Sequence, residues 1–133
     1  MTGAYLLDTC AWLDAFIAPQ KLKPEVRALI NQQSIFSIAD ITLLEVARKA
    51  EVGDLILEAT IERWFEIALP PRRSRVLAIT TQIAIESSRL PEPFHKDPAD
   101  RLIVATARIH GLTILTSDHK ILDYAHVRSL ASR

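Results

Sequence analysis

Acidic side chains follow the strands that the sequence predicts, at the points where these strands end. Asp8 comes directly after the apolar segment 4–7, and Asp118 comes shortly after the apolar segment 113–116. In an open parallel sheet, ligands bind outside the carboxyl ends of the strands. If these two strands are neighbours, the two carboxylates meet at one edge of the sheet.

Three further acids are placed to join them. Asp97 and Asp100 lie at the start of the helix that precedes the strand 113–116. Glu45 lies one turn into another helix, among apolar neighbours, where a carboxylate needs a partner. Several carboxylates that lie close together repel one another, and burial raises their pKa values unless a cation neutralises them.

A hard divalent cation is the partner that such a set of oxygen ligands favours. Mg²⁺ or Mn²⁺ can lower the pKa of a water molecule and stabilise the charge that grows on phosphate oxygens during hydrolysis of a phosphodiester. The acids therefore indicate metal-dependent phosphodiester hydrolysis. Without the cation, an acidic pocket would repel a phosphate group.

Each of these acids also has a purely structural interpretation. Asp8 and Asp118 can cap the helices that follow them. Asp97 with Pro98 is an ordinary helix start, and Asp100 occupies the third helical position of a capping box. Glu45 can be an exposed helix residue. Spacing alone leaves both interpretations open.

Several other catalytic motifs are absent from the sequence. The three glycines form neither GxGxxG nor GxxxxGK[ST], the four histidines lack the HExxH spacing, and there is no GxSxG. The segment 8–10 resembles the start of an aspartyl-phosphate phosphatase, but that chemistry wants a second acid where Cys10 stands. A single cysteine excludes an intramolecular disulfide and a multi-cysteine metal site. We expect Cys10 to be a small buried side chain.

Helices and short strands alternate along the chain. Apolar runs predict strands at 4–7, 35–39, 76–79 and 113–116. Periodicity and capping residues predict helices at 11–18, 24–32, 40 or 42 to 52, 54–67, 81–89 and 97–110, with a further helix beginning at 117–118. Gly111 is expected to end the helix 97–110. This alternation predicts an α/β fold with a parallel sheet covered on both faces.

Length and composition fit a single domain over residues 1–133. Hydrophobic residues make up 49% and charged residues 24% of the chain, which argues against a disordered protein. Sixteen basic residues balance sixteen acidic ones, so no global field indicates a nucleic-acid partner. No apolar run is long enough to span a membrane. We therefore expect a cytoplasmic protein.

Four segments together resemble the PIN-domain family, and in particular its VapC-type toxins of toxin–antitoxin pairs. The segments are LLDTCAWL (6–13), TLLEV (42–46), HKDPADRLIVATA (95–107) and LTSD (115–118). The resemblance implies a three-layer α/β/α sandwich with a central parallel sheet. It also implies a metal-dependent endoribonuclease with Mg²⁺ or Mn²⁺ as cofactor.

The resemblance assigns the catalytic acids Asp8, Glu45, Asp100 and Asp118. Of these, Asp8, Asp100 and Asp118 are expected to hold the metal, and Asp97 is an accessory acid. Thr9, Thr116 and Ser117 are expected to support the site by hydrogen bonds. Arg101 would contact a phosphate or lower the pKa of an acid, and a surface salt bridge is its alternative.

The resemblance further implies three partners: an RNA substrate, a small antitoxin and a second copy of the chain in a homodimer. The antitoxin would bind a helical arm that carries Trp64 and Phe65, where we expect exposed apolar surface. Trp12 could stack on a base, although its apolar neighbours favour a core position. Basic residues in 72–75, with His95 and Lys96, could form an RNA-binding patch.

Two other functions remain compatible with the same acids. A PIN scaffold could bind RNA or protein without cutting it. A nuclease directed at DNA is also possible, because metal-ion hydrolysis does not need a 2′-hydroxyl group.

Overall fold

A parallel sheet of five short strands forms the centre of the protein. The computed structural model describes residues 4–32 and 35–133. The strands lie in the order β3-β2-β1-β4-β5, and every neighbouring pair is parallel. Their bounds are Tyr5–Leu7 (β1), Phe36–Ala39 (β2), Ser74–Leu77 (β3), Thr113–Thr116 (β4) and Ser129–Ala131 (β5).

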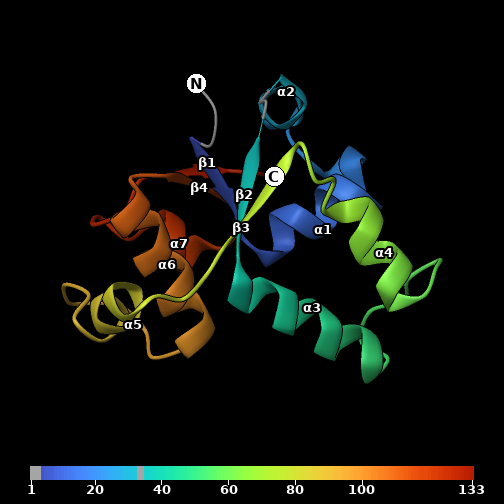
Figure 1. Ribbon diagram of the computed structural model, residues 1–133. Helices are drawn as coiled ribbons and strands as arrows, with labels where there is room; N and C mark the ends of the chain where they lie inside the picture. The colour runs from blue at the N-terminus through green and yellow to red at the C-terminus, as the bar shows by residue number, and fades with distance from the viewer. Residues whose placement is uncertain (1–3, 33–34) are drawn as a thin grey trace.

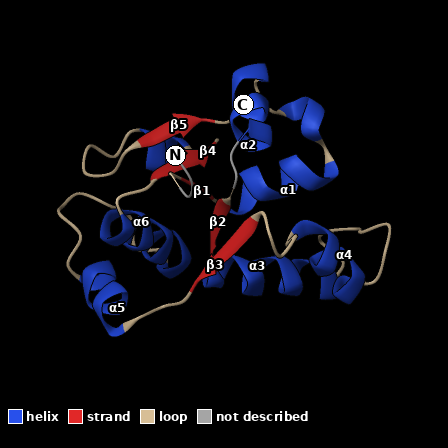
Figure 2. Ribbon diagram, turned by 45° about the horizontal axis from the view of Figure 1, so that its top comes forward, coloured by secondary structure: helices blue, strands red, loops and turns tan. Residues whose placement is uncertain are grey.

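Helices connect the strands and cover both faces of the sheet. Figure 1 shows α1, α2 and α4 on one side and α5 and α6 on the other, and Figure 2 shows the strands between the two groups. The helices are α1 (Thr9–Ile17), α2 (Pro24–Gln32), α3 (Asp40–Glu51), α4 (Ile61–Ala68), α5 (Thr81–Ser88), α6 (Pro98–His110) and α7 (His119–Leu122), with a short 3-10 helix at Pro19–Lys21.

Two separate apolar cores hold the three layers together, because successive strand residues point to opposite faces. Leu7 and Leu115 are paired across β1 and β4 and pack under α1 and α4 with Trp12. Their neighbours Leu6 and Ile114 are also paired and pack under α6. The expected α/β fold with a helix layer on each face is confirmed.

Local sequence signals position several helix ends as expected. Pro98 opens α6, and Gly111 closes it with a φ of +66°, a left-handed conformation that glycine adopts without a Cβ penalty. Trp12 lies in the core, as expected, with none of its surface exposed.

The prediction of a helix at 54–67 is wrong for the first half of that range. Gly53, with a φ of +86°, follows the end of α3, and α4 begins only at Ile61. The Thr60 hydroxyl accepts a hydrogen bond from the Arg63 N–H at 3.1 Å and caps α4 there. The apolar residues between these points line a surface groove instead of continuing a helix.

Three smaller expectations also differ from the structure. The strand predicted at 76–79 lies two residues earlier, because all four residues of β3 pair with β2. The edge strand β5 was not predicted, since three residues carry too little pattern. Cys10 is exposed, because Ala11 and Trp12 occupy the inward face of α1.

Among the described residues, no helix is both long and apolar enough to cross a membrane.

Replacing Trp12 tests how the first core is held. Its ring lies 4.9 Å from that of Trp64, and its Nε1–H donates to the carbonyl oxygen of Ala68 at 2.9 Å. Trp12→Phe would leave that buried carbonyl without its partner, so we expect a loss of about 1–3 kcal/mol in the free energy of unfolding by urea. Trp64→Phe is the matched control, because the Trp64 ring makes no hydrogen bond among the described residues. Equal losses in both variants would contradict the role of the Trp12 hydrogen bond.

Candidate active site

The order of the strands creates a crevice between β1 and β4. From β1 the chain crosses to β2 on one side, whereas from β4 it crosses to β5 on the other. Such a reversal opens a ligand-binding crevice at the carboxyl ends of the two strands. Asp8 follows β1 there, and its backbone N–H donates to the carbonyl oxygen of Leu115 at 3.2 Å.

Asp8 is a buried carboxylate with partners on both oxygens. Oδ1 accepts a hydrogen bond from the Ala11 N–H at 2.8 Å, which caps α1, and Oδ2 accepts one from the Thr116 hydroxyl. Burial raises the pKa of Asp8 to about 6, and the charges of Asp118 and Glu45 push it in the same direction. Both interpretations of Asp8, as a helix cap and as a site residue, are therefore compatible with its geometry.

Glu45 is joined to the same site by a threonine. The Thr9 hydroxyl, at the start of α1, donates to Glu45 Oε1 at 2.6 Å and lies 3.3 Å from the hydroxyl of Thr42. This contact links α1 to α3. Glu45 is half-buried in the structure, so it is not the fully exposed helix residue of its alternative interpretation.

Asp118 follows β4 and shares Thr116 with Asp8. The Asp118 backbone N–H donates to the Thr116 hydroxyl oxygen at 2.9 Å, and its side chain accepts from the Lys120 N–H at 2.9 Å. Thr116 is thus a bridge between the two acids. Ser117 makes no side-chain hydrogen bond within the described part of the chain.

Asp100 lies in the first turn of α6, where it approaches the other acids. Burial is the main cause that raises its pKa to about 7. The negative charge of Asp97 raises the pKa further, and those of Asp118 and Glu45 add smaller effects in the same direction. His95 was not predicted as its partner, yet His95 Nε2 lies 3.1 Å from Asp100 Oδ2.

Arg101 does not form the surface salt bridge that sequence analysis offered as an alternative. Its Nε–H donates to the Ser87 carbonyl oxygen at 2.8 Å, and its Nη1 donates to those of Phe94 and His95 at 3.3 and 3.2 Å. The guanidinium faces three backbone carbonyls because the loop before α6 folds back over it. Arg101 therefore positions the loop that carries His95.

An ion pair between a buried aspartate and an exposed arginine was missed. Asp14, on the inward face of α1, accepts from Arg133 Nε at 2.8 Å and from Arg133 Nη2 at 2.9 Å. Arg133 follows β5, and its charge acts on Asp8 and Cys10. An acid on the inward face of a predicted helix was the available signal, since a buried carboxylate needs a partner.

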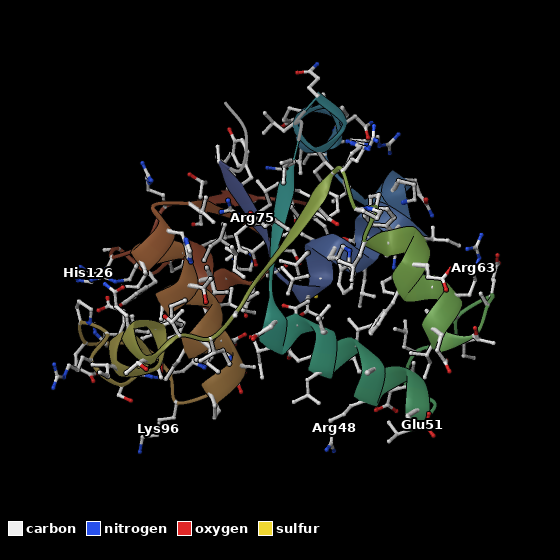
Figure 3. The ribbon with its side chains drawn as sticks, viewed as in Figure 1. Arg48, Glu51, Arg63, Arg75, Lys96 and His126 are labelled. Atoms are coloured by element: carbon white, nitrogen blue, oxygen red, sulfur yellow. The ribbon has the colours of Figure 1, made fainter. Side chains whose placement is uncertain are left out.

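The predicted basic patch is not assembled. Arg73 Nη2 donates to the backbone carbonyl oxygens of Ile30 and Asn31, which ties it to α2. Figure 3 shows Arg75 on β3 and Lys96 in a separate part of the molecule. The residues of the expected patch therefore do not form one surface.

The acids fit a hard divalent cation by the chemistry of their donors. All are oxygen ligands, and Asp8 and Asp100 have raised pKa values because burial and neighbouring acids disfavour their ionised forms. Within residues 4–32 and 35–133, no three acidic, histidine or cysteine side chains converge as a preformed metal cage. Mg²⁺ commonly keeps several water ligands and takes only one or two carboxylates directly, so it does not need such a cage.

Comparisons with known proteins agree on one family. The family model of the PIN domain matches residues 5–127. Ribonuclease VapC22 of Mycobacterium tuberculosis is 31% identical over 126 residues, which cover 90% of this chain and 95% of that protein.

Solved structures of toxin–antitoxin complexes share the fold. VapBC2 from Rickettsia felis, bound to a DNA fragment from its promoter, superposes with a TM-score of 0.73 at 16% identity and covers 97% of this chain and 98% of its own. A toxin–antitoxin complex from Klebsiella pneumoniae gives a TM-score of 0.68 at 23% identity, with 96% of each chain covered. DNA-bound VapBC from Salmonella typhimurium gives 0.65 at 24%, with 98% of each chain covered.

The raised pKa of Asp8 predicts how stability depends on pH without metal. Ionising Asp8 is harder in the folded protein than in the unfolded chain, so its stabilising contribution is complete below pH 3.8 and is lost as the pH rises through about 6. At pH 8 in a chelator, we therefore expect Asp8→Asn to be more stable than the wild type by up to about 3 kcal/mol. Urea unfolding at pH 4, 6 and 8 measures this difference.

Asp54→Asn is the control, because Asp54 is an exposed acid outside the site. The prediction would be contradicted if the free energy of unfolding changed by the same amount between pH 4 and pH 8 in the wild type and in the Asp8→Asn variant.

Proposed function

Given that the chain belongs to the PIN-domain family, we propose that it is a metal-dependent endoribonuclease toxin that a small antitoxin restrains. Similarity to Ribonuclease VapC22 supports the activity, and the structural neighbours, which are toxin–antitoxin complexes, support the restraint. The observation that carries the proposal is the buried Asp8 carboxylate, which Thr116 connects to Asp118 between β1 and β4. A ribonuclease whose substrate is cellular RNA would work in the cytoplasm.

The acids divide the proposed work among themselves. Asp8, Asp100 and Asp118 would hold Mg²⁺ or Mn²⁺, and Asp97 would add negative charge beside Asp100. Glu45, which Thr9 holds in place, would orient the attacking water. When bound, the cation lowers the pKa of water and offsets the charge that grows on the phosphate oxygens. Hydrolysis of this kind leaves a 3′-hydroxyl and a 5′-phosphate.

Replacement of Asp100 tests the nuclease. We expect Asp100→Asn to lower cleavage of single-stranded RNA by more than about 100-fold, since even the outer partners of a metal change activity by about 10–100-fold. New RNA 5′ ends, sequenced minutes after induction in bacterial cells, measure the loss without a choice of substrate. Asp54→Asn removes a charge of the same kind outside the site and should cut like the wild type.

The same assay in vitro separates the alternatives. Cutting of matched DNA strands as fast as RNA would indicate a DNA-directed nuclease. RNA retention that is identical with Mg²⁺ and with chelator, without cutting, would indicate a binding scaffold. Undiminished cleavage by Asp100→Asn would reject the assignment of the acids.

An apolar groove on the α1–α4 side is the proposed antitoxin site. The groove has a volume of about 400 Å³. Trp64 forms part of its lining but is itself buried, and the exposed apolar surface comes from Ile17, Ile56 and Ile67. Exposed apolar surface of this kind is typical of a groove that receives an amphipathic helix. The homodimer stays a prediction, which sedimentation of the purified chain would check.

A charge placed in this groove should release the antitoxin. We expect Ile56→Glu to weaken binding of the proposed antitoxin by more than about 10-fold, because one buried charge without a partner costs several kcal/mol. Isothermal titration of the co-purified partners measures the change. Ile85→Glu on α5 is the control, since Ile85 is similarly apolar and exposed but lies on the other side of the sheet. Equal weakening by both variants would contradict the groove.

A further inference from the structure

An open pocket lies beside the candidate active site, and the proposed hydrolysis does not use it. It has a volume of about 500 Å³ and is lined by Pro93, Phe94, His95, Lys120, Asp123 and Tyr124. These residues come from the loop before α6, from α7 and from the two residues after α7. Pockets of this size take small organic groups.

His95 belongs to the pocket and to the acidic site at once. Its Nδ1 accepts a long hydrogen bond of 3.4 Å from the Asp97 N–H, so in the neutral ring Nε2 carries the hydrogen. That Nε2 is buried 3.1 Å from Asp100 Oδ2, although the two are not aligned as a hydrogen bond. The pocket therefore begins one side chain away from a proposed metal ligand.

Aromatic rings form one wall of the pocket. The Phe94 ring lies 4.4 Å from that of His95 and 4.6 Å from that of Tyr124, measured between centroids. Phe94 and His95 are partly exposed whereas Tyr124 is buried, and exposed aromatic rings are the platforms on which proteins stack unpaired nucleobases. The wall thus suits a planar heterocycle better than a peptide or a bare phosphate.

The pocket is held in shape before any ligand binds. Arg101 donates to the carbonyl oxygens of Phe94 and His95, and the Tyr124 hydroxyl donates to that of Pro91 at 2.6 Å. These contacts fix the loop against α6 and against the end of α7. A preformed wall lowers the entropy that binding would otherwise cost.

Two exposed charges of opposite sign complete the lining. Lys120 can only donate hydrogen bonds and Asp123 can only accept them. Neither forms an ion pair in the described part of the chain. Together they match an edge that presents both a carbonyl or ring nitrogen and an N–H group, as nucleobases do. A phosphate would be attracted by Lys120 but repelled by Asp123.

We propose that this pocket binds one unstacked nucleobase of the RNA, next to the phosphodiester that is cut, with Lys120 and Asp123 reading its edge. The inference rests on the proposed ribonuclease function and adds a determinant of its sequence preference. The aromatic wall accepts the face of any base. The two charged side chains select among bases.

The test compares cleavage profiles on a pool of single-stranded RNA with randomised sequence. The wild type should show enrichment of one base at a fixed position beside the cut. Lys120→Met should lower that enrichment by about 5-fold or more, the effect of losing one hydrogen bond to a base. Asp123→Asn should change which base is preferred, because an amide both donates and accepts. Lys21→Met and Asp54→Asn remove the same charges elsewhere and should keep the wild-type profile.

Two outcomes would overturn the pocket while leaving the ribonuclease intact. One is an identical base profile in all five proteins. The other is slower cutting of every RNA by Lys120→Met without any change of profile, which would indicate a contact with the RNA backbone.

If the wild type cuts no RNA and the ribonuclease proposal itself fails, a binding measurement tests whether the pocket binds a nucleobase. The probes are the four ribonucleoside 5′-monophosphates, followed by NMR signals of Phe94 and Tyr124, with inorganic phosphate as the control. Saturable shifts with a nucleotide but not with phosphate, weakened in Lys120→Met, would support a nucleobase site. No shifts, or equal shifts with phosphate, would overturn it.

Discussion

The acidic site depends on two hydrogen bonds that the Thr116 hydroxyl makes. The hydroxyl donates to Asp8 at the end of β1 and accepts from the Asp118 N–H at the end of β4. Thr116 can make both contacts only because β1 and β4 are neighbours with Leu7 paired to Leu115. A slip of β1 by one residue against β4 would turn Leu7 to the opposite core while Leu115 stayed in place. The apolar pairing that builds the two cores therefore also sets the positions of the acids.

Capping and catalysis are often treated as competing explanations of an acid at a helix start, but a carboxylate has two oxygens. In Asp8, Oδ1 caps α1 while Oδ2 meets Thr116. Asp118 likewise caps α7 through its side chain. The cap fixes the direction of the side chain, and this suits a group that must hold a ligand. Because one carboxylate can serve both purposes, the sequence pattern of a helix cap and that of a site residue coincide. Spacing alone therefore does not identify such a site.

The sequence predicted those features that depend on neighbours in the chain, and it failed where distant residues decide. Apolar runs and caps sufficed for β4, α6 and the two acids, Asp8 and Asp118, that follow the first and the last predicted strands. They could not show that Arg133 would reach Asp14, or that Arg101 would bind loop carbonyls, since both contacts are made across the fold. The helix expected at 54–67 failed because apolar spacing does not distinguish a helix from a loop that lines a groove. Resemblance to a family supplied the set of acids, whereas His95 became visible only through its distance from Asp100.

The partners of the acids leave the negative charge of their carboxylates without a counter-charge from the chain. Asp8 and Glu45 each accept a hydrogen bond from a threonine hydroxyl, and Asp118 accepts one from a backbone N–H. Each of these contacts orients a carboxylate without neutralising it. The arginines nearby are occupied elsewhere: Arg101 faces backbone carbonyls, and Arg133 is paired with Asp14. No lysine or arginine forms an ion pair with Asp8, Glu45, Asp100 or Asp118 in the residues that the structure describes. Neutral donors give these acids fixed positions while their charge stays available, and that combination is the one that the proposed metal site requires, since a network of salt bridges would already have neutralised the carboxylates.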